Sequence, residues 1–288
     1  MRTVGRFAPS PTGPLHFGSL VAALASWLDA RRADGRWLLR IEDLDPPRVM
    51  PGAESEILRQ LEALGLSWDG PVLRQSERLD AYAGALRRLE AHCYACACTR
   101  KELEDSALAL DGSRIYPGTC RGGPAPGKTA RAIRVRTSRD AIRFADRVQG
   151  EIAQSVEAEV GDFILRRSDG VYAYQLAVVV DDDAQGVTDV VRGADLLDST
   201  ARQIHLQRLL GAATPRYLHV PVATNAAGEK LSKQTGAGAA GTGDLRRALL
   251  FLGQSVPMDL TPREALGWAL RHWDAGRIPR ARAVPVIS

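Results

Sequence analysis

The stretch that decides the fold is Arg6-Phe-Ala-Pro-Ser-Pro-Thr-Gly-Pro-Leu-His-Phe-Gly18, which follows a short apolar opening. Its three prolines and two glycines exclude regular helix and central strand. The spacing of apolar residues after it predicts a helix over 19–32. A strand, a rigid loop and a helix start present unpaired backbone N–H groups and a positive dipole end, which favour phosphate. We therefore predict a phosphate loop with His16 at the helix mouth and Gly18 allowing close approach to the backbone. The alternative is an ordinary surface turn.

The composition is that of a soluble globular protein. The chain has 288 residues, of which 45% are hydrophobic and 25% charged. The net charge of +4 permits a nucleic-acid partner without requiring one. No run of about 18 apolar residues and no signal pattern occur, so we expect no membrane span and a cytoplasmic protein. The four cysteines are clustered, unlike those of a disulfide framework.

Two segments are typical of buried parallel strands, 36–41 and 187–191. Carboxylates follow the first within 42–45, and Arg192 follows the second. The carboxyl ends of parallel strands are where α/β sheets bind ligands. An acidic turn capping a helix that begins near position 51 is the alternative for the carboxylates. The pattern predicts an α/β fold with a parallel sheet.

Helical spacing of apolar residues predicts helices over 54–64, 76–89, 199–210, 244–252 and 261–274. Ser76 is the expected N-cap of the second, and a capping box begins the last. Alternation with a period of two predicts that 132–135 and 142–144 are paired strands with an arginine-bearing face, either solvated or against RNA phosphates. We expect Asp181-Asp182-Asp183 to be a loop or a helix cap rather than a metal site.

Four thiols, Cys93, Cys96, Cys98 and Cys120, are enough to hold one tetrahedral zinc ion. The pair Cys93-x-x-Cys96 competes with the tighter pair Cys96-x-Cys98, and buried thiols without a metal are the alternative. Further along the chain, Lys230 and Lys233 lie three residues apart in a glycine-flanked loop. Such a loop can fold over polyphosphate.

Two of these segments together resemble the class I aminoacyl-tRNA synthetases. Pro14-Leu-His-Phe-Gly18 is similar to their HIGH signature, and Lys230-Leu-Ser-Lys-Gln234 is similar to their KMSKS loop. Arg6-Phe-Ala-Pro-Ser-Pro-Thr-Gly13 and Arg40-Ile-Glu-Asp-Leu-Asp45 resemble the glutamyl branch. The segments 176–182 and 191–197 support the same branch, and the resemblance covers about residues 3–234.

This resemblance implies a Rossmann-like nucleotide-binding domain interrupted by a zinc-containing α/β insert. The catalytic domain would comprise 1–92 and 187–240, the insert 93–186, and a short helical tail 241–288. Only 54 residues follow position 234 (288 − 234), so we expect no anticodon-binding domain. The chain then most resembles truncated paralogues of glutamyl-tRNA synthetase.

Those paralogues activate L-glutamate with ATP and attach it to queuosine at the wobble position of tRNA(Asp). The partners implied are ATP with Mg²⁺, L-glutamate and queuosine-containing tRNA(Asp), and we expect a monomer. A minimal glutamyl-tRNA synthetase charging a tRNA 3′ end is one alternative. An inactive nucleotide- or RNA-binding paralogue is the other.

The resemblance also assigns residues by position. The glutamate-binding positions are Arg6, Ser10, Glu42, Tyr174 and Arg192. The ATP-binding positions are Pro9, His16, Gly18 and Lys233, and the catalytic ones are His16, Lys230 and Lys233. The implied ligands of one structural zinc are Cys96, Cys98, Tyr116 and Cys120, with Cys93 or His92 as rivals for the fourth.

Overall fold

The computed structural model describes residues 2–109, 111–225, 227–231 and 238–286. Its strands are β1 (Val4–Phe7), β2 (Arg36–Ile41), β3 (Leu73–Arg74), β4 (Cys93–Cys96), β5 (Ala132–Val135), β6 (Ala141–Asp146), β7 (Gly150–Ser155), β8 (Ile164–Arg166), β9 (Asp189–Gly193), β10 (Arg216–Val220), β11 (Val222–Thr224) and β12 (Ala283–Pro285). Its α-helices are α1 (Phe17–Arg32), α2 (Ala53–Ala63), α3 (Leu79–Arg88), α4 (Val156–Glu159), α5 (Tyr174–Ala184), α6 (Thr200–Leu210), α7 (Asp244–Phe251) and α8 (Pro262–His272).

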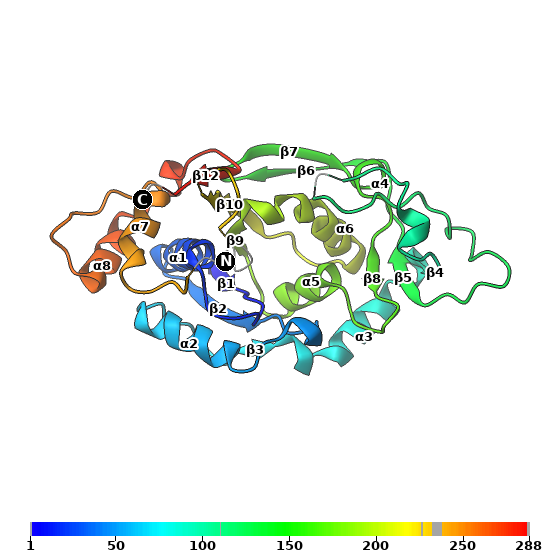
Figure 1. The fold of residues 1–288 in the computed structure, drawn as a ribbon, viewed down its shortest axis with the longest axis horizontal. Helices are drawn as coiled ribbons and strands as arrows, with labels where there is room; N and C mark the ends of the chain where they lie inside the picture. The colour runs from blue at the N-terminus through cyan, green and yellow to red at the C-terminus, as the bar shows by residue number, and fades with distance from the viewer. Residues whose placement is uncertain (1, 110, 226, 232–237, 287–288) are drawn as a thin grey trace.

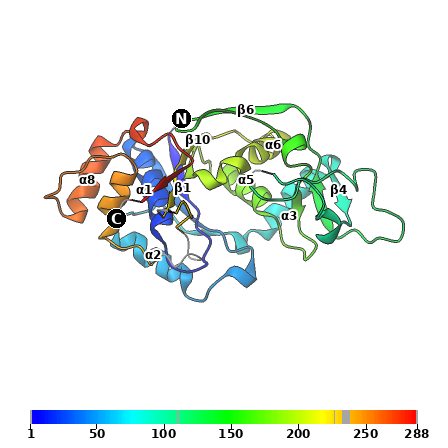
Figure 2. The same cartoon turned by 45° about the horizontal axis from the view of Figure 1, so that its top comes forward.

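The molecule is elongated, with α8 near one end and β4 near the other in both views (Figures 1 and 2). The helices α5 and α6 lie between the central helix α1 and the β4 end (Figure 1). The N-terminal strands therefore sit in the body of the molecule, and the segment around β4 and β5 projects from it.

A parallel sheet forms the centre of the fold. β1 pairs with β2, β2 with β3, and β9 with β10, all in parallel. The two groups of strands meet at Val4 and Thr188: the N–H of Val4 donates to Thr188 Oγ1, and the N–H of Thr188 donates to the Val4 carbonyl. β1 packs beside β9, so the group β3-β2-β1 and the group β9-β10 lie side by side with the switch point between β1 and β9, as in doubly wound sheets. The predicted Rossmann-like α/β fold is confirmed.

The helix α1 packs on this sheet, against β1, β2, β9 and β10. It is buried on nearly all sides because α7 and α8 pack against it from elsewhere. It begins at Phe17, two residues before the predicted start, since His16 is its N-cap and accepts a hydrogen bond from the Ser19 N–H. The rigid loop of the opening stretch therefore leads directly into a buried helix.

A second apolar core lies where α3, α5 and α6 meet, and it includes Tyr82, Leu176 and Ile204. The prediction that Asp181-Asp182-Asp183 is a loop or a helix cap is wrong, because all three lie within α5. The helical period turns Asp181 and Asp182 inward, where arginines contact both carboxylates, and leaves Asp183 exposed. Three consecutive acids fit a helix here because two of them are paired.

The prediction that Ser76 caps the next helix is also wrong. The helix α3 begins at Leu79 with Arg78 as its N-cap residue. The Ser76 hydroxyl instead donates to Asp43 (2.6 Å), and the Ser76 N–H donates to the same carboxylate (2.8 Å). Ser76 therefore bonds the Asp43 carboxylate and does not cap the helix.

The segments 132–135 and 142–144 lie in strands β5 and β6, but the prediction that they pair with each other is wrong. β5 pairs with β4 and β8, whereas β6 pairs with β7 in a hairpin and with β10 in parallel. Alternation along one strand gives its two faces and carries no information on its partner. Because β6 pairs with β10, the β6–β7 hairpin belongs to the same sheet as β9 and β10.

The C-terminal segment packs on the body. The predicted capping box is present at α8, where Thr261 and Glu264 bond each other's backbone N–H. Trp273 is buried, and its Nε1 donates to Asp29 of α1 (3.2 Å). The last strand, β12, pairs in parallel with β11.

Across the described residues, we find no helix with the length and apolar character needed to span a membrane.

Candidate active site

A cavity of about 610 Å³ opens at the carboxyl ends of β1, β2, β9 and β10. It is lined by all five residues predicted to bind glutamate: Arg6, Ser10, Glu42, Tyr174 and Arg192. It is also lined by four residues predicted for ATP or for catalysis: Pro9, His16, Gly18 and Lys230. Lys233 lies outside the described residues. The sequence positions that the resemblance assigned are thus brought together from segments more than two hundred residues apart.

His16 is positioned by the helix start that it caps. Its Nδ1 accepts a hydrogen bond from the Ser19 N–H (3.3 Å), and its Nε2 lies 3.0 Å from the Ser19 hydroxyl. A methyl group at Gly18 would lie 3.2 Å from Cε1 of His16 and 3.6 Å from the carbonyl oxygen of Leu231. Glycine therefore keeps the imidazole and the loop after β11 close to the mouth of α1, where the helix dipole favours phosphate.

Arg6 and Arg40 share one carboxylate next to the cavity. The Nε of Arg6 lies 3.2 Å from Oδ1 of Asp182, and Nη1 of Arg40 lies 2.8 Å from the same oxygen. Burial alone would raise the pKa of Asp182, but the two guanidinium groups outweigh burial and hold that pKa below its usual range. Asp182 therefore stays ionised and fixes both arginines.

Glu42 extends this network to the cavity wall. Its Oε1 accepts a hydrogen bond from Nη2 of Arg40 (3.3 Å). Burial raises the pKa of Glu42, and the attraction of Arg40 and Arg6 opposes that rise only in part. A further cation beside Glu42 would favour its ionised form. The wall at Glu42 therefore suits an ammonium group.

Arg192 is the last buried residue of β9 and is held by several acceptors. Nη2 donates to Thr200 Oγ1 (2.9 Å) and to the Leu196 carbonyl (3.3 Å). Nη1 lies 3.4 Å from the hydroxyl oxygen of Tyr174. With Arg6, this gives one cavity two guanidinium groups, which suit a ligand with two carboxylates.

Sequence analysis did not predict His219 or Asp146. The Nε of Arg192 donates to Nε2 of His219 (3.0 Å), and Nδ1 of His219 lies 2.6 Å from Oδ2 of Asp146. A single histidine in an apolar strand belongs to no recognisable motif, so the sequence does not indicate a function for it. The structure makes His219 on β10 the register partner of Arg192 on β9, a pairing that the sequence does not reveal.

Lys230 lies just after β11, at the rim of the cavity. Its Nζ donates to Oδ2 of Asp195 at 2.5 Å, and both side chains are partly exposed. Ion pairs of this kind contribute little to stability because water screens them. The lysine is therefore held near the cavity by a contact that a ligand phosphate can replace.

A separate cluster of thiols lies at the C-terminal end of β4. The sulfur atoms of Cys96, Cys98 and Cys120 are within 4.8 Å of one another. The Tyr116 hydroxyl lies 3.5 Å from the sulfurs of both Cys96 and Cys98. In a tetrahedral zinc site with Zn–S bonds of about 2.3 Å, the sulfurs are about 3.8 Å apart. The four donors therefore fit the spacing of a tetrahedral ion.

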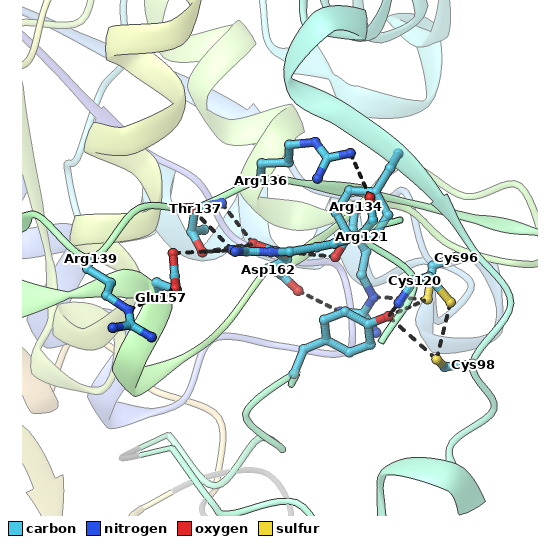
Figure 3. Close-up of polar contacts among 12 residues, drawn as sticks. Cys96, Cys98, Cys120, Arg121, Arg134, Arg136, Thr137, Arg139, Glu157 and Asp162 are labelled. Carbon is cyan, nitrogen blue, oxygen red and sulfur yellow. Dashed lines mark hydrogen bonds and ion pairs between the residues drawn. The ribbon is translucent and has the colours of Figure 1, made fainter. Parts of the chain in front are cut away.

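Two buried residues lie beside this cluster and are joined to each other, since Nη1 of Arg134 donates to the Asp162 carbonyl at 2.7 Å (Figure 3). The guanidinium of Arg134 lies 3.7 Å above the Tyr116 ring, and its Nε is 3.3 Å from the Cys96 sulfur. The carboxylate of Asp162 accepts hydrogen bonds from Arg121 and from the Thr137 N–H (2.8 Å). The cation of Arg134 beside the Cys96 sulfur is the arrangement expected around a thiolate.

The rival fourth ligands lie elsewhere. Cys93 is the first residue of β4 and packs against the core of α3, α5 and α6, not against the other three thiols. Burial raises the pKa of the Cys93 thiol to about 11, so it stays protonated at neutral pH. Among the described histidine, cysteine and acidic residues, the cluster contains Cys96, Cys98 and Cys120 and does not contain His92.

The comparison with protein families agrees with the sheet and the cavity. Residues 2–250 match the model of the tRNA synthetases class I (E and Q), catalytic domain. The chain belongs to this family, the class I tRNA synthetases for glutamate and glutamine.

Individual relatives of this chain carry the name of one enzyme within that family. A glutamyl-Q tRNA(Asp) synthetase of Aromatoleum aromaticum is 58% identical over 96% of this chain and 90% of that protein. Proteins of the same name from Dechloromonas aromatica and Pseudomonas aeruginosa PAO1 are 58% and 54% identical. Those matches cover 96% and 98% of this chain, and 95% and 97% of the relatives. The chain is thus similar to glutamyl-Q tRNA(Asp) synthetases over nearly its whole length.

Solved structures show the same fold. The glutamate-tRNA synthetase of Elizabethkingia anophelis matches with a TM-score of 0.79 and 25% identity, over 99% of this chain and 68% of that one. The glutamate tRNA ligase of Elizabethkingia meningosepticum also matches with a TM-score of 0.79, at 24% identity, over 100% of this chain and 67% of that one.

Proposed function

We propose that this protein activates L-glutamate with ATP and transfers the glutamate to queuosine at the wobble position of tRNA(Asp). The single observation that carries the proposal is the cavity, which gathers every described residue predicted for glutamate and for ATP. The relatives named glutamyl-Q tRNA(Asp) synthetase support the choice of acceptor.

The glutamate half of the cavity would be formed around Arg6 and Arg192. Each guanidinium can bind one carboxylate of glutamate through charge-assisted hydrogen bonds. Glu42 would hold the ammonium group, which in turn would favour the ionised form of Glu42. Tyr174 and Ser10 would add hydrogen bonds from hydroxyl groups.

The ATP half would lie at the mouth of α1. The glutamate α-carboxylate attacks the α-phosphorus of ATP and expels pyrophosphate, so the enzyme supplies no nucleophile. Catalysis is then positioning and charge stabilisation. His16, Gly18 and Pro9 would hold the nucleotide, and Lys230 with Lys233 would bind the departing pyrophosphate. Mg²⁺ bound with ATP would neutralise phosphate charge.

In the second step, a hydroxyl group of the queuosine ring attacks the carbonyl carbon of the glutamyl-adenylate, and AMP leaves.

We further propose that Cys96, Cys98, Tyr116 and Cys120 hold one structural zinc ion. That ion would fix the end of β4 to the segment that contains Tyr116 and Cys120. The division into a catalytic domain, an insert at 93–186 and a tail at 241–288 belongs to the same proposal, as does a cytoplasmic monomer.

The test of function supplies labelled glutamate and ATP with three RNAs. These are queuosine-containing tRNA(Asp), tRNA(Asp) without queuosine, and tRNA(Glu). We expect label on the first RNA only. Label on tRNA(Glu) would instead support a minimal glutamyl-tRNA synthetase, and failure of glutamate-dependent pyrophosphate exchange would support an inactive paralogue.

A further inference from the structure

His219 lies in the middle of a buried chain of three side chains that ends at the cavity. It belongs to β10 and is fully buried, and neither it nor Asp146 is among the described residues that line the cavity. Arg192, next to it on β9, does line the cavity. His219 can therefore affect the cavity through Arg192 and not by touching a ligand.

The hydrogen bonds determine which nitrogen of His219 carries the proton. The Nε of an arginine always bears a hydrogen, so at 3.0 Å the Nε2 of His219 must accept from Arg192. The hydrogen of the neutral ring then sits on Nδ1, 2.6 Å from Oδ2 of Asp146. Burial and the charge of Arg192 lower the pKa of His219 to about 4, although Asp146 opposes this. The ring is thus neutral at physiological pH.

Asp146 is itself fixed by the backbone. Its Oδ1 accepts hydrogen bonds from the N–H groups of Val148 (3.0 Å), Gln149 (2.8 Å) and His219 (3.2 Å). Burial would raise its pKa, but His219 and these N–H groups lower it to about 2. An ionised carboxylate therefore remains opposite Nδ1, and it selects the tautomer that leaves Nε2 free of hydrogen.

We propose that His219, held in its Nδ1–H form by Asp146, is a positioning residue that orients the Arg192 guanidinium for a carboxylate of the amino-acid substrate. The inference rests on the proposed function, because it assigns Arg192 to glutamate. His219 accepts at Nε of Arg192, while Thr200 and the Leu196 carbonyl accept at Nη2. These contacts occupy the hydrogens of Nε and Nη2 and fix the plane of the guanidinium, so the hydrogens of Nη1, near the cavity-lining Tyr174, are the ones left to bind a carboxylate.

Two substitutions distinguish the roles of the two ring nitrogens of His219. In His219→Asn, the amide nitrogen lies near the position of Nδ1 and can donate to Asp146, but the side chain is too short to accept from Arg192. In His219→Gln, the amide oxygen can reach the position of Nε2 and accept from Arg192. The pair therefore removes or restores the acceptor at the position of Nε2, which lies 3.0 Å from Nε of Arg192 and 3.3 Å from Thr200 Oγ1. Asp146→Asn is a third variant, which removes the charge that selects the tautomer.

We expect His219→Asn to raise the KM for glutamate about 10–100-fold in pyrophosphate exchange, the loss of one hydrogen bond to a charged group. The KM for ATP should change less than about twofold, because Arg192 lies in the glutamate half of the site. His219→Gln should return the KM for glutamate to within a few-fold of the wild type. Asp146→Asn should raise the same KM. Calorimetric titration with glutamate gives the same comparison as a Kd, without turnover.

An unchanged glutamate KM and Kd in His219→Asn would overturn the inference. So would equal impairment of the Asn and Gln variants, or a parallel rise of both KM values, since a purely structural role predicts those results. Failure of the proposed function is distinguishable, because there the wild type itself shows no glutamate-dependent exchange. The calorimetric Kd values then still decide the inference. If His219→Asn fails to fold, the other two variants still test the inference, because Asp146→Asn should raise the KM for glutamate and His219→Gln should leave it near the wild-type value.

Discussion

The Nε of Arg6 lies 3.2 Å from Oδ1 of Asp182, although 176 residues separate them in the chain. Arg6 comes from the first strand and Asp182 from the last turn of α5. The same carboxylate also accepts from Nη1 of Arg40 (2.8 Å), so two buried cations share this anion. This contact ties the side of the cavity that contains Arg6 to the second core of the molecule.

Replacing Asp182 with asparagine should therefore affect both stability and binding. The amide keeps the shape but removes the charge that two buried arginines require, and loss of one partner of a buried pair costs about 3–5 kcal/mol. We expect urea unfolding to show a decrease of that size and the glutamate KM to rise. Asp183→Asn is the matched control, because Asp183 is exposed on the same helix. Equal stability of the two variants would refute the role given to Asp182.

Substitutions of His16 should distinguish catalysis from capping. We expect His16→Ala to lower the rate of pyrophosphate exchange by about 10²–10³, the cost of one lost donor at the reacting phosphate. His16→Asn keeps a side chain that can cap α1. It should match the wild type in thermal unfolding and still lose rate. A His16→Asn enzyme with near wild-type exchange would show that His16 serves only as the N-cap.

The sequence predicted the parts of the site that follow general rules. Arg6, Glu42 and Arg192 lie in or directly after strands, and the carboxyl ends of parallel strands meet at one edge of the sheet. His16 caps α1 and Gly18 lies in its first turn, directly after a loop whose prolines exclude helix and central strand. For these residues local pattern and resemblance agree.

The parts that failed depend on pairing across the chain. Period two identified β5 and β6 as strands but did not reveal that β6 pairs with β10. Asp182 stands in an acidic run that resembles a loop, and only the distant Arg6 and Arg40 explain its burial. Asp146 comes from the end of β6, and His219 had no motif around it. Such contacts have no local signal.

The stability of the protein should fall as the pH decreases from about 6.5 to about 4. His219 has a pKa of about 4 in the folded chain, below its ordinary 6.5, chiefly because of burial. In this window the unfolded chain binds a proton at His219 that the folded chain excludes, so acid favours unfolding. The total effect of this group is about 3 kcal/mol.

The measurement is urea unfolding at several pH values, for the wild type and for His219→Gln. The glutamine cannot titrate, so its curve should be flatter between pH 4 and 6.5. The difference between the two proteins isolates His219 from other groups, including His205, whose pKa burial also lowers. Parallel curves would contradict the assignment of a neutral His219.

The thiol cluster should bind one equivalent of zinc. We expect metal analysis of the purified protein to find that equivalent, and we expect Cys98→Ala and Tyr116→Phe to weaken binding by at least about 10–100-fold in chelator competition. Cys93→Ala is the matched control and should retain the metal, because Cys93 packs in a different core. Loss of zinc from Cys93→Ala but not from Tyr116→Phe would mean that Cys93 is the fourth ligand.

The position of the glutamate on the RNA tests the central claim most directly. After transfer of labelled glutamate to queuosine-containing tRNA(Asp), digestion with a ribonuclease separates the anticodon fragment from the 3′-terminal fragment. The proposed function predicts label in the anticodon fragment, on the nucleoside that carries queuosine. Label on the 3′-terminal adenosine would contradict it and would identify an ordinary aminoacylation.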